Sequence, residues 1–261
     1  TYTRPETETI SALRNFGVEK SSGKYLAFLD ADVELSSNWA ECMLSTLNAV
    51  NSRVITSAIQ KNGKNAPPLE KIRTALSNAI TDQNVSFLPG RNLFLSNKVF
   101  YQIGGFPEHL ITCEDYYFTD RANKLGDLFY TSDATYVHLG EDKDFYEMAK
   151  KEIWRGQSNL QSVKGRKIPL NEIPSFIIPI GLISLILLAF LLLISGYQIL
   201  AGLSFVLAIL PVVIYSTRLY RLASDQISLL QIIKFYLYYF PARAIGTLGG
   251  VFKTFSTKSH S

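Results

Sequence analysis

The feature that most constrains what this chain can fold into is an uncharged run from Ile173 to Thr217. One helix needs about 20 predominantly apolar residues to cross the hydrocarbon core of a bilayer. A run of 45 residues therefore fits two spans joined by a tight turn, which we expect at residues 195–198, Ser-Gly-Tyr-Gln. A buried helical hairpin in a soluble core is the alternative, but too little chain remains to enclose it. The sequence predicts two transmembrane helices over residues 173–217.

Basic side chains flank this run on both sides, which predicts that both flanks stay in the cytosol. They are Lys150, Lys151, Arg155, Lys164, Arg166 and Lys167 before it, and Arg218, Arg221, Lys234, Arg243 and Lys253 after it. Residues 149–172 form a basic juxtamembrane linker that signals topology, rests on anionic lipid, or does both. Residues 218–261 are expected to form an amphipathic interfacial helix, over Ile227–Phe240, and a basic tail. A third span is disfavoured because it would carry that tail outward.

Composition supports a membrane protein and sets further limits. Hydrophobic residues make up 47% of the chain and charged residues 18%, so membrane lipid is an expected partner. The formal net charge of +4 gives no reason to expect a nucleic-acid partner. Cys42 and Cys113 lack a Cys-x-x-Cys spacing, which favours reduced thiols over a disulfide framework or zinc site. Position 1 is Thr with no leader after it, so we expect that the chain is cut at its start.

Ahead of the hairpin, strand-like and helix-like segments alternate over about 140 residues, the pattern of an α/β domain with a mainly parallel sheet. Lys24–Leu29 is predicted as a fully buried strand and Val54–Ile59 as a second strand. Ile10, Leu13 and Val18 recur at helical spacing and predict the apolar face of a helix. We place this domain at residues 1–148.

Two carboxylates stand directly after the first of these strands, at Asp30 and Asp32. Ligands of open α/β sheets bind at the carboxyl ends of strands. A pair of carboxylates with one residue between them can hold Mg²⁺ or Mn²⁺ and leave positions free for a diphosphate. The alternative is that either Asp caps the following turn. Alone, the Asp-x-Asp pattern is weak, because it occurs by chance in many sequences.

The neighbouring motifs make the pattern more specific. They are Leu13-Arg14-Asn15-Phe16-Gly17, Ser22-Gly23-Lys24-Tyr25, Phe28-Leu29-Asp30-Ala31-Asp32, Pro89-Gly90-Arg91-Asn92, Gly104-Gly105-Phe106-Pro107-Glu108 and Glu114-Asp115. In this order they resemble family 2 glycosyltransferases, whose nucleotide-sugar domain has the GT-A fold. The resemblance covers roughly residues 9–140, while the membrane region matches only in general plan. It implies transfer of a sugar from a nucleotide-sugar donor.

The resemblance also implies the roles of individual residues at the donor site. Asp32 would bind the metal and Asp30 would contact the donor nucleotide or its metal. The remaining donor-site residues would be Arg14 and Asn15 beside the pocket, Gly90 where backbone approaches the sugar, and Asn92 facing the donor or acceptor. For Arg14 a surface salt bridge is the open alternative.

Glu114 and Asp115 begin a helical segment, where acidic residues also suit the helix dipole. By the resemblance, Asp115 would be the base that takes the proton from the acceptor hydroxyl in a single inverting displacement. Glu114 would orient the acceptor or position Asp115. Capping of the helix is the alternative for both residues.

His138 follows a probable strand and could be a third metal ligand, contact the diphosphate, or be a structural histidine. Trp154 and Arg155 are candidates for a contact with the acceptor or diphosphate. Processive polysaccharide synthases of the family carry Gln-x-x-Arg-Trp at this stage of the chain. Here the stretch reads Lys-Glu-Ile-Trp-Arg, without the glutamine and with the last two residues reversed. Transfer of one or a few sugars is therefore favoured over processive synthesis.

The first βα units of the GT-A fold, which bind the nucleotide base, have no match here. At about 30 residues for a βαβ unit, we expect on the order of 60 residues to be missing. The function expected is inverting, metal-dependent sugar transfer to a lipid-linked or membrane-proximal glycan acceptor at the cytosolic membrane face, in cell-surface glycan or polysaccharide synthesis. The alternatives are a processive synthase and a non-catalytic membrane-bound relative that serves as a binding subunit.

Overall fold

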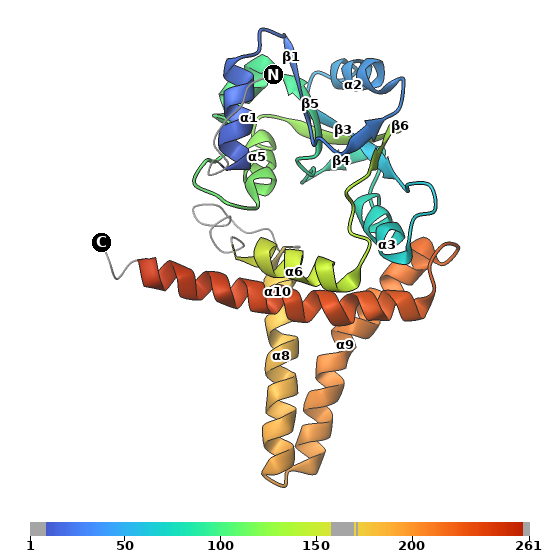
Figure 1. The fold of residues 1–261 in the computed structure, drawn as a ribbon, viewed down its shortest axis with the longest axis vertical. Helices are drawn as coiled ribbons and strands as arrows, with labels where there is room; N and C mark the ends of the chain where they lie inside the picture. Colours follow the sequence, from blue (N-terminus) through green and yellow to red (C-terminus); the bar gives the residue numbers. More distant parts are fainter. Residues whose placement is uncertain (1–8, 158–169, 171, 258–261) are drawn as a thin grey trace. The chain divides into compact units, whose positions relative to one another are not determined.

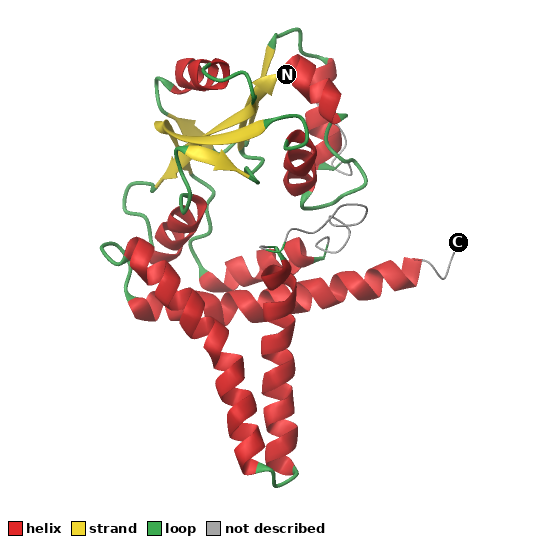
Figure 2. Ribbon diagram, turned by 180° about the vertical axis from the view of Figure 1, so that it is seen from behind, coloured by secondary structure: helices red, strands yellow, loops and turns green. Residues whose placement is uncertain are grey.

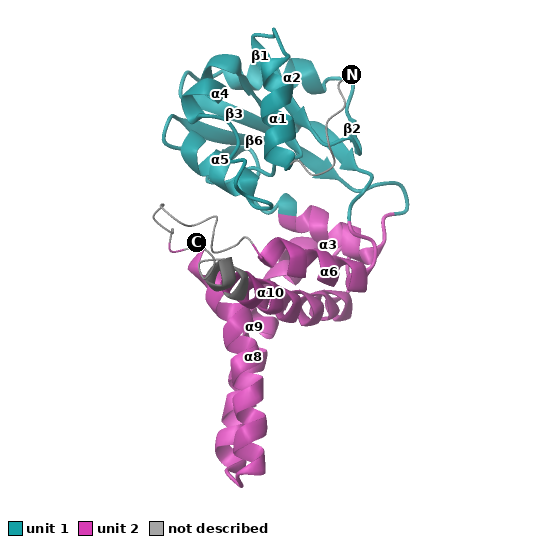
Figure 3. Ribbon diagram, turned by 60° about the vertical axis from the view of Figure 1, so that its left-hand side comes forward, with its two compact units in different colours: residues 1–65, 77–141 teal, residues 66–76, 142–261 magenta. Residues whose placement is uncertain are grey.

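The computed structural model describes residues 9–157, 170 and 172–257, with side chains up to residue 251. Contacts divide the chain into two compact units (Figure 3). Unit 1 holds residues up to 65 and residues 77–141, and unit 2 holds residues 66–76 and those from 142 onward. Parts of the predicted basic linker and tail, including Lys164, Arg166 and Lys167, lie outside the described residues.

Unit 1 is built on a six-stranded mixed sheet with the order β1-β5-β3-β6-β2, and β4 pairs with β6 (Figures 1 and 2). The strands are β1 (Tyr25–Leu29), β2 (Val33–Leu35), β3 (Arg53–Lys61), β4 (Gln83–Val85), β5 (Asn92–Ser96) and β6 (Asp127–His138). β3 and β6 are parallel, and the other described pairs are antiparallel.

The prediction of a mainly parallel sheet is therefore wrong. β5 enters the middle of the sheet in the opposite direction to both neighbours, so Leu29 pairs with Asn92 and Tyr25 with Ser96. Local periodicity separates strands from helices, but the direction of a strand relative to its neighbours depends on which strands come together. The second predicted strand, Val54–Ile59, is confirmed within β3.

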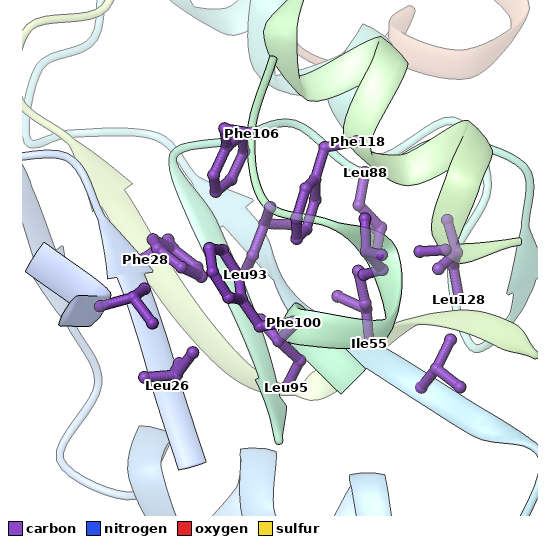
Figure 4. Close-up of a cluster of buried hydrophobic side chains, with 14 of the residues drawn as sticks. Leu26, Phe28, Ile55, Leu88, Leu93, Leu95, Phe100, Phe106, Phe118 and Leu128 are labelled. Carbon is purple, nitrogen blue, oxygen red and sulfur yellow. The ribbon is translucent and has the colours of Figure 1, made fainter. Parts of the chain in front are cut away.

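Helices cover both faces of this sheet (Figure 2). The helices of unit 1 are α1 (Ile10–Glu19), α2 (Trp39–Asn48), α4 (Asn97–Ile103) and α5 (Glu114–Ala122). Side chains alternate along β5, so Leu93 and Leu95 join one buried cluster and Phe94 joins another. Helices α1, α4 and α5 contribute to the first cluster, shown in Figure 4, and α2 contributes to the second.

An aromatic group within the first cluster ties the loop after α4 to α5 and β1 (Figure 4). The rings of Phe106 and Phe118 stack with centroids 4.0 Å apart, and Phe28 meets Phe106 edge-on at 5.0 Å. Both arrangements are favoured by the quadrupoles of the rings. Phe28 lies just before Asp30 and Phe118 just after Asp115. This packing therefore holds the two acidic motifs near one another.

β1 and α1 are less buried than the sequence pattern predicted. Phe28 is buried but Leu29 is 38% exposed, so the prediction of a fully buried strand is wrong. In α1, Val18 is buried whereas Ile10 and Leu13 are 44% and 43% exposed. Within the described residues β1 pairs with β5 alone, and a groove of about 350 Å³ lies between β1 and α1. The pattern of apolar residues did not reveal this open edge.

Unit 2 is helical. Its helices are α3 (Pro68–Ser77, the last residue belonging to unit 1), α6 (Phe145–Gly156), α8 (Ile173–Ile194), α9 (Gln198–Ala223) and α10 (Leu229–Thr257). The predicted turn is confirmed, because Gly196, at φ 84°, reverses the chain between α8 and α9. Both helices are long and apolar enough to cross a membrane. Beside the turn, Ile194 and Ile199 are 82% and 80% exposed, as lipid-facing side chains would be.

α10 crosses α8 and α9 and packs along α6 (Figures 1 and 2). It is longer than the stretch that the apolar pattern marked. A Cβ at Gly156 would lie 2.8 Å from the Cα of Gly246, and one at Gly250 would collide with the carbonyl oxygen of Gln157. Small residues four apart let two helix backbones approach closely. Gly246 and Gly250 therefore allow the close packing of α10 against α6.

A cluster of charged side chains also joins α3, α6 and α10. Its two acids, Asp142 and Glu152, have side chains only 2% and 4% exposed. The cations that pair with them are Arg73, Lys151, Arg155 and Arg243. Buried carboxylates are tolerated when several donors surround them. The cluster fixes the three helices of unit 2 relative to one another.

Candidate active site

The two aspartates stand between β1 and β2, and the pairing of β2 with β6 brings His138 beside them. Val33 pairs with His138, and the amide of Leu139 donates a 2.8 Å hydrogen bond to the carbonyl oxygen of Asp32. The Nε2 atom of His138 lies 3.3 Å from Oδ2 of Asp32. One ligand atom from each of Asp30, Asp32 and His138 falls within 4.8 Å of the others. The structure thus brings together the three residues predicted as metal ligands.

This set of donors fits a divalent metal ion. Carboxylate oxygens suit Mg²⁺ and Mn²⁺, and an imidazole nitrogen is an acceptable additional ligand for Mn²⁺. All three residues are partly exposed, so a bound ion could keep positions open for a ligand. Asp30 and Asp32 would hold the ion from the end of β1, and His138 would hold it from the end of β6.

Arg14 connects the acidic motifs through one guanidinium group. Its Nη2 donates to Oδ1 of Asp30 and to the carbonyl oxygen of Gly90, each at 3.2 Å, and its Nη1 donates to Oε1 of Glu114 at 3.0 Å. The arginine side chain is 14% exposed and its guanidinium also lies 5.0 Å from the ring centroid of Phe106. A planar guanidinium presents donors on two terminal nitrogens in a fixed arrangement, whereas an ammonium group would have to serve all three acceptors from one nitrogen. Arg14 is therefore more than a surface salt bridge.

Asp115 lies beside this bridge, at the start of α5. Its Oδ2 accepts from the amide of Gly90 at 3.1 Å, and its Oδ1 accepts from the amide of Tyr116 at 2.8 Å. A Cβ on Gly90 would lie 2.8 Å from Nη1 of Arg14 and 3.2 Å from Cβ of Asp115. Any side chain at position 90 would thus push apart the arginine and the aspartate. Glycine is needed there for close approach.

Asn15 acts as a clamp on the loop after α4. Its side-chain amide donates to the carbonyl oxygen of Phe106 at 2.9 Å and to Oε1 of Glu108 at 2.8 Å, and its Oδ1 accepts from the amide of Phe106 at 2.8 Å. Gly105 has a positive φ of 75°, and a Cβ at this position would lie only 3.0 Å from Oδ1 of Asn15. Glycine therefore fits here better than a residue with a side chain. The loop and the helix that carries Arg14 are joined by this side chain.

Glu114 is largely buried next to Arg14, with its side chain 13% exposed. Burial raises the pKa of its carboxyl above the ordinary value of 4.5, and the neighbouring Asp115 raises that pKa further, while Arg14 opposes both effects. Desolvation penalises the charged form of a carboxyl group. Glu114 thus lies next to Asp115, the candidate base, in surroundings that destabilise its ionised form.

Of the three remaining predicted site residues, one lies in the core of unit 1 and two belong to unit 2. Asn92 is fully buried, where its Oδ1 accepts from Nε1 of Trp39 at 3.1 Å and its amide donates to the carbonyl oxygen of Ala58 at 3.4 Å. This places Asn92 in the core. Trp154 and Arg155 lie on α6 of unit 2, where Trp154 is 46% exposed and Arg155 belongs to the charged cluster described above.

The sequence interpretation missed the segment that follows His138. Gly140 lies so close to Asp32 that a Cβ at this position would collide with Oδ2 of the aspartate. Glu141 is buried, with its Oε2 3.3 Å from Nδ1 of His138. The sequence did contain a signal for this contact, because Gly140 and Glu141 follow His138 within three residues. It was too short to interpret without the contacts.

The bridging role of Arg14 predicts that Arg14→Lys will destabilise unit 1. One ammonium group cannot reach all three acceptors, so a partly buried acceptor is left unsatisfied and we expect a loss of about 1–3 kcal/mol in the free energy of unfolding. Chemical denaturation followed by circular dichroism measures this loss. Arg121→Lys, on the exposed surface of α5, is the matched control and should change little. Equal stability of the two variants would contradict the bridge.

The raised pKa of Glu114 predicts a pH-dependent effect of Glu114→Gln. The native state binds this proton more tightly than the unfolded state, so Glu114 lowers the stability of the protein as pH rises from 4.5 through the raised pKa. Glutamine does not titrate. Relative to the unsubstituted protein, Glu114→Gln should therefore gain in melting temperature as the pH rises from 4.5 through the raised pKa. Glu41→Gln, at an exposed site on α2, is the control for removal of a carboxylate, and a shrinking advantage of Glu114→Gln would refute the argument.

Comparison with known proteins agrees with this geometry. Residues 1–106 match the family described as Glycosyl transferase family 2, and this range includes Arg14, Asp30, Asp32 and Gly90. The chain is 30% identical over 156 residues to Glycosyltransferase AglE of Haloferax volcanii. That match covers 58% of this chain and 50% of AglE, so the chain spans about half the length of this curated relative.

Among solved structures, the chain is similar in fold to the mannosyltransferase PcManGT from Pyrobaculum calidifontis, determined in complex with GDP-Man and Mn²⁺. The TM-score is 0.55 at 12% sequence identity, and the alignment covers 97% of this chain and 68% of PcManGT. At this identity the likeness concerns the fold alone. Together with the family match and the assembled motifs, it leads to one conclusion: residues 1–106 match glycosyl transferase family 2, and the chain has a GT-A-like fold followed by two long apolar helices.

Proposed function

We propose that this protein transfers a sugar from a nucleotide-sugar donor to a lipid-linked or membrane-proximal glycan acceptor, with inversion at the anomeric carbon. The observation that carries the proposal is the Arg14 bridge, which gathers Asp30, Gly90 and Glu114 within hydrogen-bond distance of one guanidinium. A candidate metal site therefore lies on one side of the bridge and a candidate base on the other. A non-catalytic relative would have no need to keep these groups together.

The donor would be held through its diphosphate. Asp30, Asp32 and His138 would bind Mn²⁺ or Mg²⁺, and the ion would neutralise the charge that develops on the departing nucleoside diphosphate. The complex of PcManGT with GDP-Man and Mn²⁺ supports this class of donor and cofactor.

Asp115 is the proposed base. As the acceptor oxygen forms its bond to the anomeric carbon, the bond from that carbon to the diphosphate oxygen breaks, and the hydroxyl proton passes to Asp115. The amides of Gly90 and Tyr116 fix the direction of the carboxylate before the reaction. Glu114, held by Arg14, is placed to orient the acceptor. One displacement of this kind inverts the configuration.

The membrane arrangement supports a lipid-linked acceptor. We propose that α8 and α9 cross the membrane as a hairpin with unit 1 in the cytosol, as part of cell-surface glycan or polysaccharide synthesis. Unit 2 carries 15 of the 26 basic residues and only 7 of the 22 acidic residues, which suits a surface of anionic lipid. α10 leaves Leu230, Leu237, Ile245 and Leu248 exposed, as an interfacial helix would.

Asp115→Asn tests the base. Asparagine keeps the size of the side chain but cannot take the proton, so the rate of transfer should fall by about 10²–10⁴-fold while donor affinity stays within a few fold. A panel of nucleotide sugars with Mn²⁺ and isolated membranes measures transfer, and equilibrium binding of the donor measures affinity. Asp133→Asn, at an exposed position of β6, is the control. Near-normal transfer by Asp115→Asn would refute the assignment.

Cysteine labelling tests the orientation of the hairpin. With Cys42 and Cys113 replaced by alanine, Ser195→Cys in the turn should react with a membrane-impermeant maleimide in intact cells. Lys64→Cys, on an exposed loop of unit 1, should react only in inverted vesicles, because unit 1 faces the cytosol. Labelling of both positions from the same side would exclude a hairpin that crosses the bilayer.

A further inference from the structure

Behind the candidate metal site, on the side of the His138 ring away from Asp32, lies a buried carboxylate. The ring presents Nε2 to Oδ2 of Asp32 at 3.3 Å, and its Nδ1 lies 3.3 Å from Oε2 of Glu141. The Glu141 side chain is 2% exposed, against 14% for His138. A carboxylate buried this deeply is costly unless donors surround it.

One neutral donor, Gln60, and one charged donor, Arg91, hold Glu141 in place. Nε2 of Gln60 donates to its Oε2 at 3.0 Å, and Nη1 of Arg91 donates to the same oxygen at 3.2 Å. Arg91 is itself held, because its Nη2 donates to Oγ of Ser77 at 3.1 Å. The carboxylate therefore has a fixed position beneath the imidazole and does not depend on a ligand to order it.

The short segment between His138 and Glu141 is built to pack against Asp32. The amide of Leu139 donates to the carbonyl oxygen of Asp32, and the amide of Glu141 donates back to the carbonyl oxygen of His138 at 3.2 Å. Gly140 leaves the space that Oδ2 of Asp32 occupies. These contacts bring the ligand atoms and the buried carboxylate into one rigid arrangement.

The position of the ring proton decides whether His138 can bind a metal. Arg91 Nη1 also lies 3.3 Å from Nδ1, so without a metal it could donate to Nδ1 while Nε2–H donates to Asp32. A metal at Nε2 requires the lone pair there and therefore a proton on Nδ1. Among the described contacts of Nδ1, the acceptor for that proton is Glu141. Histidine ligands of metals usually donate their second ring nitrogen to such a group.

We propose that Glu141 is a positioning residue of the metal site, which accepts the Nδ1 proton of His138 and so directs Nε2 toward the ion bound by Asp30 and Asp32. Gln60 and Arg91 hold the carboxylate that performs this role. The inference rests on the metal site of the proposed function. It gives a role to Glu141, which lies outside the motifs predicted to contact the sugar donor. It requires no change in the reaction itself.

Mn²⁺ affinity, measured without any sugar donor, tests the role of Glu141. The full chain is purified in neutral detergent, and free Mn²⁺ is titrated by electron paramagnetic resonance. Glu141→Gln should raise the dissociation constant for Mn²⁺ by about 10–100-fold, because loss of an outer partner of a ligating histidine has this effect. Glu41→Gln, an exposed carboxylate on α2, is the matched control and should bind normally.

A second variant, Glu141→Asp, distinguishes loss of the positioning role from loss of folding. It keeps the buried negative charge near Arg91 and Gln60 but withdraws the carboxylate from Nδ1 by one methylene group. We expect weakened Mn²⁺ binding with a melting temperature closer to that of the unsubstituted protein than Glu141→Gln shows. In a His138→Ala background, Glu141→Gln should have no further effect on Mn²⁺ affinity, since coupled sites are not additive.

The outcomes separate this inference from the proposed function. Normal Mn²⁺ affinity in both Glu141 variants, or an equal effect of Glu141→Gln with and without His138, would overturn the positioning role and leave the proposed transfer standing. Absence of Mn²⁺ binding by the unsubstituted protein would overturn both.

Discussion

The site depends first on one partly buried guanidinium. Arg14 reaches acceptors that stand 16, 76 and 100 residues away in the chain, at Asp30, Gly90 and Glu114. Charge-assisted hydrogen bonds of this kind are stronger and more directional than neutral ones. Because the guanidinium is planar, its donors also fix the angles at which the three segments meet. The guanidinium draws the loop at Gly90 and the start of α5 together. This brings Asp115 to the place where its carboxylate accepts from the amide of Gly90.

The surrounding fold protects this arrangement in two ways. Phe28, Phe106 and Phe118 pack beneath the bridge, so the ends of β1 and α5 are held by apolar contact as well as by hydrogen bonds. Asn15 then ties the loop of Phe106 back to the helix that carries Arg14. Adjacent residues of α1 thus perform different tasks: one gathers polar groups and the other fixes a loop.

Buried carboxylates recur in both units, and each is surrounded by donors. Glu141 in unit 1 accepts from Gln60 and Arg91, and Glu152 in unit 2 accepts from Arg73, Arg155 and Arg243. Such groups specify geometry, because an unmatched arrangement would leave a charge without partners. In unit 2 the result is a fixed set of helices, and in unit 1 it is a fixed imidazole ring.

The sequence alone determined the features that depend on local pattern. The length of the uncharged run indicated two long apolar helices, the apolar stretch before Asp30 placed the aspartates at a strand end, and the motif order predicted the GT-A-like fold. Tertiary structure decided what depends on neighbours. β5 runs antiparallel in the middle of the sheet, Asn92 turns into the core against Trp39, and Glu141 lies under His138. Periodicity and composition report how one segment meets its environment, whereas strand direction and side-chain partners depend on which distant segments come together, and no local pattern contains that information.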